Sequence, residues 1–241
     1  CSPLQATVIA EEGPLPFIAL SNDLPALVVH TSGTTGAAQA IPKNLGQLSS
    51  EVMTLEATFG DMLGDACIVA TVSHQHIYGL LFKVLWPLWA GRAIHARSQN
   101  FPEQLAQLLS HGSCVLIASP AHLKRLPDHL AWSDVTALRA IFSSGGPLSP
   151  EGAQTTAQLL GQVPIEVYGS SETGGIAWRQ RSGGASESWL PLRDVEWRVT
   201  PDEGLLQVRS PHLPNADWFS LADRAQAEGS TRFILLSLIH I

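Results

Sequence analysis

The feature that most constrains the fold is the alternation of short apolar runs with segments of helical spacing over the first two thirds of the chain. The apolar runs predict strands at Pro25–His30, Ala66–Val72, Arg92–Ala96, Ser113–Ser119, Leu138–Ser143 and Pro164–Tyr168. The helical spacing predicts helices at Leu45–Phe59, Tyr78–Trp89, Pro102–His111 and Pro150–Leu160. This alternation is typical of an α/β fold with a mostly parallel sheet covered by helices. In such a fold, ligands are expected at the carboxyl ends of the strands.

The pattern changes after Gly184. Val195–Thr200 and Leu205–Ser210 alternate apolar and polar residues on either side of Pro201–Gly204, whose proline and glycine favour a turn. We therefore expect a partial α/β core over residues 1–184 and a small antiparallel β portion over residues 185–235. Gly183–Ser186 is the expected mobile link, and Thr231–Leu236 has the composition of a further strand.

Composition and charge exclude several classes of function. The 241 residues are 45% hydrophobic and 15% charged, which is enough apolar material for a sizeable core. A formal net charge of −7 argues against a general nucleic-acid-binding surface. Ile77–Ala90 is too short for a membrane span and contains Lys83. The three cysteines lack metal-ligand spacing, and we expect a reduced, cytoplasmic protein.

The strongest chemical signal is Thr31–Gly36, with the sequence TSGTTG, which directly follows the first predicted strand and precedes Lys43. Glycines let backbone N–H groups turn inward and hydroxyls add further donors, so the segment is suited to binding phosphate oxygens. It does not match the GxxxxGK[ST] pattern of the Walker loop. A flexible Ser/Thr/Gly loop without a ligand is the alternative interpretation.

The second signal is Tyr168–Gly175, with the sequence YGSSETGG, which also follows an apolar run. A carboxylate among small hydroxyl residues suits Mg²⁺, which prefers one or two carboxylates together with substrate phosphates. The alternative is a hairpin turn with a solvated Glu172.

Together with these two motifs, His76–Gly79 (HIYG), Ser144–Leu148 (SGGPL) and Leu221–Asp223 (LAD) occur in an order that resembles the adenylate-forming (ANL) superfamily. This superfamily includes acyl-CoA and aryl-CoA synthetases, luciferases and the adenylation domains of peptide synthetases. The resemblance covers most of the chain, but only the central and later parts of that superfamily's large amino-terminal domain.

The resemblance implies a role for each motif. The β- and γ-phosphates of ATP would be held by the loop of Thr31, Ser32, Gly33, Thr34, Thr35 and Gly36. The wall of the adenine and acyl pockets would be formed by Ser144, Gly145, Gly146 and Pro147. In the third motif, Tyr168 would stack on adenine, Ser171 would contact the α-phosphate and Glu172 would bind Mg²⁺, with Gly169, Ser170 and Thr173 completing the cofactor-binding turn. His76 would shape the carboxylate site, and Asp223 would accept hydrogen bonds from the ribose.

Several positions depart from the superfamily pattern. The lysine usual three residues after the phosphate loop is Gln39 here, and Lys43 is the candidate substitute. The ribose segment is LAD where TGD is common. The carboxyl-terminal domain that bears the superfamily's catalytic lysine is absent. The chain starts at Cys1, and residues 236–241 end it without a turn, cap or polar tail, so we expect it to be a fragment with a non-native tail. The alternative is a real apolar strand at a natural terminus.

The implied reaction is attack of a small-molecule carboxylic acid on the α-phosphorus of ATP, which gives an acyl-adenylate and pyrophosphate. Coenzyme A or the thiol of an acyl carrier protein would then accept the acyl group, and the fragment alone would be poorly active or inactive. Two other functions remain open at this point. One is a non-catalytic nucleotide-binding or regulatory module, and the other is a kinase that transfers the γ-phosphate.

Overall fold

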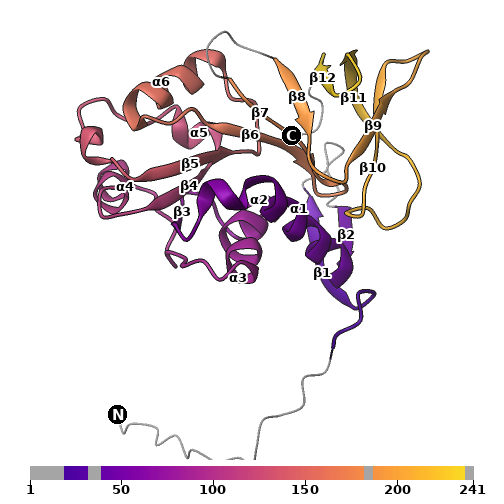
Figure 1. The fold of residues 1–241 in the computed structure, drawn as a ribbon, viewed down its shortest axis with the longest axis horizontal. Coiled ribbons are helices and arrows are strands. Elements are labelled where there is room, and N and C mark those ends of the chain that lie inside the picture. The colour runs from indigo at the N-terminus through magenta and orange to yellow at the C-terminus, as the bar shows by residue number, and fades with distance from the viewer. Residues whose placement is uncertain (1–18, 32–38, 182–186, 237–241) are drawn as a thin grey trace, which may run out of the picture.

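The computed structural model describes residues 19–31, 39–181 and 187–236. Two sheets are present in this part of the chain, a ten-stranded sheet of order β3-β4-β5-β6-β7-β8-β12-β11-β10-β9 and a two-stranded sheet formed by β1 and β2. Figure 1 shows helices around one half of the large sheet and bare strands in the other half. The predicted α/β class with an additional antiparallel portion is therefore confirmed.

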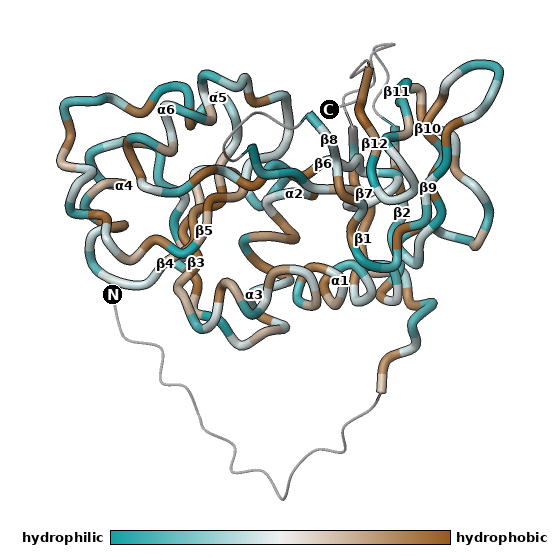
Figure 2. Tube along the Cα trace, turned by 45° about the horizontal axis from the view of Figure 1, so that its top comes forward, coloured by the Kyte–Doolittle hydropathy of each residue, from teal (hydrophilic) through white to brown (hydrophobic). Residues whose placement is uncertain are grey.

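The first half of the large sheet is parallel and buried. Its strands are β3 (Cys67–Ala70), β4 (Cys114–Ala118), β5 (Leu138–Ser143) and β6 (Ile165–Ser170). Every residue of β4 is buried, as expected for a strand that is covered on both faces. Much of the trace at β3, β4 and β5 has the colour of hydrophobic residues in Figure 2.

Helices cover both faces of this half (Figure 1). One face packs against α1 (Leu45–Leu63) and a continuous helical segment made of α2 (Ile77–Gly79), the π-helix η1 (Leu80–Leu85) and α3 (Trp86–Trp89). The other face packs against α4 (Pro102–Leu109), α5 (Pro120–Leu123), the 3₁₀ turn η2 (Trp132–Asp134) and α6 (Pro150–Leu160). No helix among the described residues is long and apolar enough to cross a membrane.

The second half of the large sheet is antiparallel. Its strands are β7 (Gly174–Gln180), β8 (Ser188–Pro191), β9 (Glu196–Val199), β10 (Leu205–Arg209), β11 (Phe219–Glu228) and β12 (Arg232–Leu235). The predicted hairpin around Pro201–Gly204 is the antiparallel pair β9–β10. The sheet is continuous between β7 and β8, across the boundary expected at residue 184, so the division into two units stays a prediction. The expected link Gly183–Ser186 lies outside the described residues, as do Ser237–Ile241 of the expected tail.

Two predicted strands differ from the structure. Pro25–His30 was expected to be a buried strand of the parallel sheet, but β1 (Pro25–Thr31) pairs only with β2 (Gln39–Asn44), and Val28 is 53% exposed. The second strand was missed because its proline and polar residues hide the alternation. Arg92–Ala96 forms a single bridge between Ile68 and Ile94 and no strand.

Aromatic side chains fix the helices to the parallel sheet. Phe142 of β5 is fully buried, and its ring centroid lies 5.1 Å from that of Phe59, 5.2 Å from that of Phe82 and 5.8 Å from that of Trp86. These contacts join α1, η1 and α3 to the centre of one strand. Edge-to-face pairs of this kind add to the free energy of burial.

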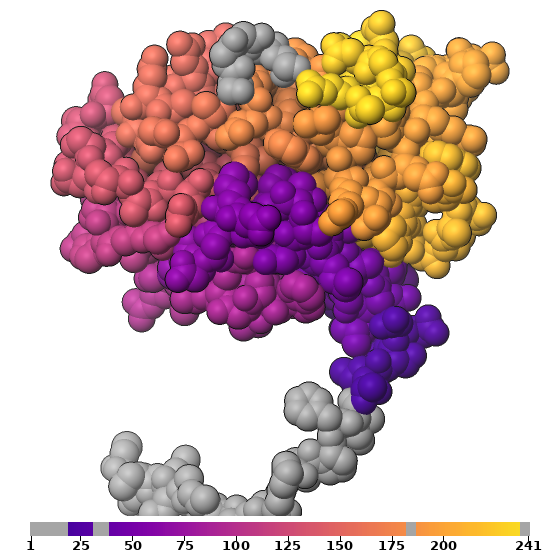
Figure 3. Space-filling view, in the orientation of Figure 1, coloured from indigo at the N-terminus to yellow at the C-terminus, as the bar shows by residue number. Residues whose placement is uncertain are grey.

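A set of buried polar contacts ties α1 to the residues just before β11. Gln47 Nε2 donates to the carbonyl oxygen of His212 at 3.0 Å, and His212 Nε2 lies 3.2 Å from Thr54 Oγ1. His212 Nδ1 lies 3.2 Å from the carbonyl oxygen of Gly175. Since a carbonyl can only accept, Nδ1 carries the proton and Nε2 accepts from the threonine, so the neutral imidazole is satisfied on both sides. In Figure 3, residues from the first third of the chain lie directly against the carboxyl-terminal strands.

We predict that Phe142→Ala lowers the free energy of unfolding by about 3–5 kcal/mol, because it leaves a cavity among three aromatic rings. Leu88→Ala is the control, since Leu88 is 64% exposed, and its effect is expected to stay within about 0.5 kcal/mol. Denaturant unfolding measures both variants. Equal effects would contradict the central position of Phe142.

A second prediction concerns pH. Burial lowers the pKa of His212 below its usual value, and the nearby Lys43 charge acts in the same direction, while Glu51, Asp194 and the Gly175 carbonyl oppose it. As pH falls below about 6.5, the unfolded chain therefore takes up the His212 proton before the folded chain does, and stability declines. His212→Gln removes this titration, so the stability gap between wild type and variant should narrow from pH 7 to pH 5. A difference in the free energy of unfolding between wild type and variant that stays constant from pH 7 to pH 5 would contradict the burial of a neutral imidazole.

Candidate nucleotide site

The carboxyl ends of β5 and β6 bring two of the sequence motifs together. Ser144, directly after β5, donates its Oγ hydrogen to the carbonyl oxygen of Val167 in β6 at 2.9 Å. The next residue, Gly145, has a φ of 80°, a backbone conformation that glycine adopts without strain. Ser144–Pro147 therefore begins beside Tyr168, at the edge of the sheet where ligands of α/β folds bind.

The second motif is a β-hairpin turn, which joins β6 to β7 through residues 171–173. Ser170 and Thr173 close it: the amide of Ser170 donates to Thr173 Oγ1 at 3.2 Å, and the amide of Thr173 donates to Ser170 Oγ at 3.3 Å. A Cβ on Gly169 would lie 2.3 Å from the carbonyl oxygen of Gly174, so the backbone itself occupies the space of a side chain. The turn is tightly constrained, and Glu172 at its tip is only partly buried.

Two side chains from the segment that follows the phosphate loop hold this turn. Lys43 Nζ, from β2, donates to the backbone carbonyl oxygen of Glu172 at 2.9 Å. Glu51, from α1, accepts the amide hydrogen of Gly175 at 2.6 Å. Lys43 is 3% exposed and Glu51 is 4% exposed. Two buried side chains are thus joined to a turn more than 120 positions later in the chain.

Tyr168 and Asp223 meet as a buried pair. The phenol of Tyr168 donates to Asp223 Oδ2 at 2.7 Å, and the exposed fractions of the two residues are 2% and 0%. Burial and the neighbouring carboxylate raise the pKa of Tyr168. The ring centroid of Tyr168 lies 5.5 Å from that of Trp189. The two predicted nucleotide contacts are therefore neighbours, but stacking of Tyr168 on adenine would require the residues that cover its ring to move.

The phosphate loop lies mostly outside the described residues. Ser32, Gly33, Thr34, Thr35 and Gly36 are all in the gap, whose flanking residues Thr31 and Gln39 are paired across β1 and β2. Gln39 is exposed at this end of the hairpin. The loop therefore starts and ends at the same point of the fold.

His76 is exposed at the start of α2, at the end of the loop that follows β3. Its carbonyl oxygen accepts from the amide of Leu80 at 2.8 Å. Gly79 is required beside it, because a Cβ there would lie 2.0 Å from the carbonyl oxygen of Ser73. The structure gives no contact between His76 and the Glu172 turn, so its predicted role at the carboxylate site stays a prediction.

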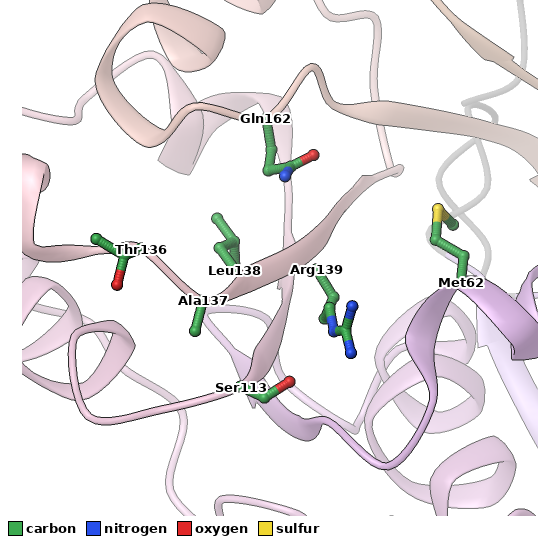
Figure 4. Close-up of a pocket in the computed structure, with 7 residues that line it drawn as sticks. All are labelled: Met62, Ser113, Thr136, Ala137, Leu138, Arg139 and Gln162. Atoms are coloured by element: carbon green, nitrogen blue, oxygen red, sulfur yellow. The ribbon is translucent and has the colours of Figure 1, made fainter.

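Two cavities lie at different edges of the sheet. One of about 500 Å³ is lined by residues at the amino ends of β4 and β5, among them Ser113, Arg139 and Gln162 (Figure 4). This is the edge opposite the motifs, so we do not assign it to the nucleotide. A cavity of about 180 Å³ lies at the carboxyl ends of β3 and β4 and includes Thr71 and Ala118.

The acidic residues of the candidate site suit a magnesium ion that takes most of its ligands from a bound nucleotide. The described residues contain no group of three or more His, Cys, Asp or Glu side chains arranged to hold a metal. Glu172 offers a carboxylate that accepts no hydrogen bond from the described part of the chain, in the turn that the contact between the Ser170 and Thr173 hydroxyls closes. One carboxylate completed by substrate phosphates is a usual environment for Mg²⁺.

Sequence reasoning missed Glu51 and His212. The signal for Glu51 lies in α1, where the polar residues Gln47, Glu51 and Thr54 are buried at a spacing of four and three residues, beside the apolar stripe of Leu48, Val52 and Leu55. Polar side chains at helical spacing next to an apolar stripe indicate buried hydrogen bonds. His212, which follows Pro211 in the connection between β10 and β11, carries no comparable local signal.

Comparisons with known proteins identify the family of the chain. The family model described as AMP-binding enzyme matches residues 3–211. A 4-coumarate–CoA ligase of Rhodobacter capsulatus is 30% identical over 224 residues, which cover 91% of this chain and 53% of the relative. An acetyl-coenzyme A synthetase of Pyrobaculum arsenaticum is 26% identical, with 65% of this chain and 25% of the relative covered.

Solved structures share the fold. A malonyl-CoA ligase in a product complex with methylmalonyl-CoA and AMP has a TM-score of 0.79 at 24% identity, over 93% of this chain and 55% of that chain. The amide bond synthetase McbA of Marinactinospora thermotolerans has a TM-score of 0.80 at 20% identity, over 96% and 52%. The chain spans about half the length of the first of these curated relatives. The chain belongs to the family of AMP-binding enzymes.

Proposed function

We propose that the protein activates a carboxylic acid with ATP, forming an acyl-adenylate and releasing pyrophosphate, and that the acyl group then passes to a thiol. The observation that carries this proposal is the contact between the buried Lys43 of β2 and the backbone of Glu172. It joins the hairpin that bears the TSGTTG loop to the turn that bears the acidic residue. The names of the relatives, 4-coumarate–CoA ligase and acetyl-coenzyme A synthetase, support acid activation and coenzyme A as the thiol acceptor.

In this proposal the protein mainly positions groups and neutralises charge, as is usual for transfer at phosphorus. The Thr31–Gly36 loop and Ser171 hold phosphates, and the Glu172 carboxylate holds Mg²⁺. When bound, Mg²⁺ neutralises charge on the phosphates of ATP. Ser144–Pro147 bounds the adenine and acyl pockets. Asp223, which is fully buried and accepts from Tyr168 in this structure, accepts from the ribose hydroxyls once the residues that cover it move.

The transfer step and its acceptor belong to the complete protein. A carrier-protein thiol is the alternative acceptor to coenzyme A.

A non-catalytic nucleotide-binding module is the second candidate, and one observation favours it. Gln39 stands where the family resemblance places a lysine, and it is exposed at the mouth of the phosphate-loop hairpin. An uncharged side chain there would weaken the charge neutralisation that catalysis requires.

We predict that the full-length protein exchanges pyrophosphate into ATP when supplied with a suitable member of a panel of carboxylic acids. Glu172→Gln should lower this exchange by at least about 100-fold, since it removes a charged group that acts on the phosphates. Glu203→Gln is the matched control, because Glu203 is exposed in the β9–β10 turn and should have no effect.

Other outcomes separate the alternatives. Nucleotide binding without exchange for any acid would favour the module. Transfer of the γ-phosphate without AMP formation would favour a kinase, and no nucleotide binding by the folded protein would contradict the whole proposal.

A further inference from the structure

Lys43 is an unusual lysine because its ammonium group lies inside the protein. The residue is 3% exposed, and its Nζ donates to the backbone carbonyl oxygen of Glu172 at 2.9 Å. Burial lowers the pKa of Lys43, while the Glu51 and Glu172 charges act in the opposite direction. Removing an ammonium from water is costly unless nearby acceptors and opposite charges compensate, and both are present here.

The lysine works together with Glu51. The Glu51 carboxylate accepts from the amide of Gly175 at 2.6 Å, three residues after the carbonyl that Lys43 contacts. A Cβ on Gly174 would lie 2.8 Å from a carboxylate oxygen of Glu51, so the glycine lets the acid approach the backbone. One side chain from β2 and one from α1 therefore hold the two ends of Glu172–Gly175.

Lys43 is not at the place of the lysine that the family resemblance implies. It lies four residues beyond Gln39 on the same strand, which is a separation of about 13 Å at the usual rise of a β-strand. Gln39 pairs with Thr31 beside the phosphate loop, whereas Lys43 pairs with Leu27 farther along the hairpin. Its ammonium is already bonded to a backbone carbonyl, away from the exposed end of the strand.

We propose that Lys43 is a positioning residue for the adenylation reaction, which fixes the backbone of Glu172 so that its carboxylate is held toward the nucleotide-bound Mg²⁺. Lys43 does not itself contact the phosphates, and Glu51 is its partner in holding the turn. This inference rests on the proposed function given above.

The kinetic test uses the full-length protein and three variants. Lys43→Met keeps most of the side-chain volume without the charge. Lys43→Met/Glu51→Gln also neutralises the acid that would otherwise lose its partner, and it serves as the second variant if the single one folds poorly. Lys124→Met is the matched control, since Lys124 is exposed after α5.

Pyrophosphate exchange is measured as a function of Mg²⁺ and of ATP. In Lys43→Met, the Mg²⁺ concentration for half-maximal exchange should rise by about 10–100-fold, the range typical for residues that orient a metal ligand. Saturating Mg²⁺ should restore most of the rate, with the KM for ATP unchanged. The Lys124→Met variant should match the wild type.

Two kinetic outcomes would overturn the proposal. A higher KM for ATP at saturating Mg²⁺, with an unchanged Mg²⁺ requirement, would make Lys43 a phosphate ligand. A lower rate with neither constant changed would mean that the substitution only reduces the fraction of folded protein.

Hydrogen exchange gives a measurement that does not depend on activity. Backbone amides of residues 168–176 should exchange faster in Lys43→Met than in the wild type or in Lys124→Met, because the turn loses one of its two anchors. Unchanged exchange in this segment would overturn the proposal. If no acid supports pyrophosphate exchange, the proposed function fails, and hydrogen exchange still decides whether Lys43 holds the turn.

Discussion

The architecture of the candidate site depends on a buried ammonium group that is hydrogen-bonded to a backbone carbonyl. Lys43 in β2 and Glu51 in α1 both lie shortly after the phosphate loop in the sequence. Lys43 contacts Glu172 and Glu51 contacts Gly175, each more than a hundred residues later. A buried ion of one sign is stable only beside compensating groups, so these contacts favour one relative placement of the hairpin, α1 and the turn. The groups of the candidate site are then positioned by the fold before any ligand arrives.

The same region is tied to the carboxyl-terminal strands. His212 contacts both Thr54 of α1 and the carbonyl oxygen of Gly175, and Asp223 of β11 accepts from Tyr168 of β6. The antiparallel portion thus reaches the motifs of the parallel half through buried hydrogen bonds. These are costly to break because a buried polar group without a partner pays its full desolvation penalty.

Much of the fold was predictable from local patterns. Cys114–Ala118 and residues 140–142 are continuous apolar runs because both faces of a parallel strand are covered, and the helix at Pro150–Leu160 begins with Ser149 capping and proline in its first turn. β2 and β7 escaped prediction, since Pro42 interrupts one and consecutive glycines begin the other. Both segments form strands because they pair with neighbouring strands, β2 with β1 and β7 with β6 and β8. Their composition alone does not indicate a strand.

The site was predictable as a set of motifs but not as a set of contacts. TSGTTG, SGGPL and YGSSETGG are recognisable by their glycines and hydroxyls, whereas the roles of Lys43 and Glu51 depend on pairs separated by more than 120 residues.

The most direct measurement is a crystal structure of the full-length protein with Mg²⁺ and a non-hydrolysable ATP analogue. The account predicts phosphates against Thr31–Gly36, the metal at Glu172 and Lys43 Nζ still on the Glu172 carbonyl. A nucleotide bound elsewhere, or Lys43 turned onto the phosphates, would contradict it.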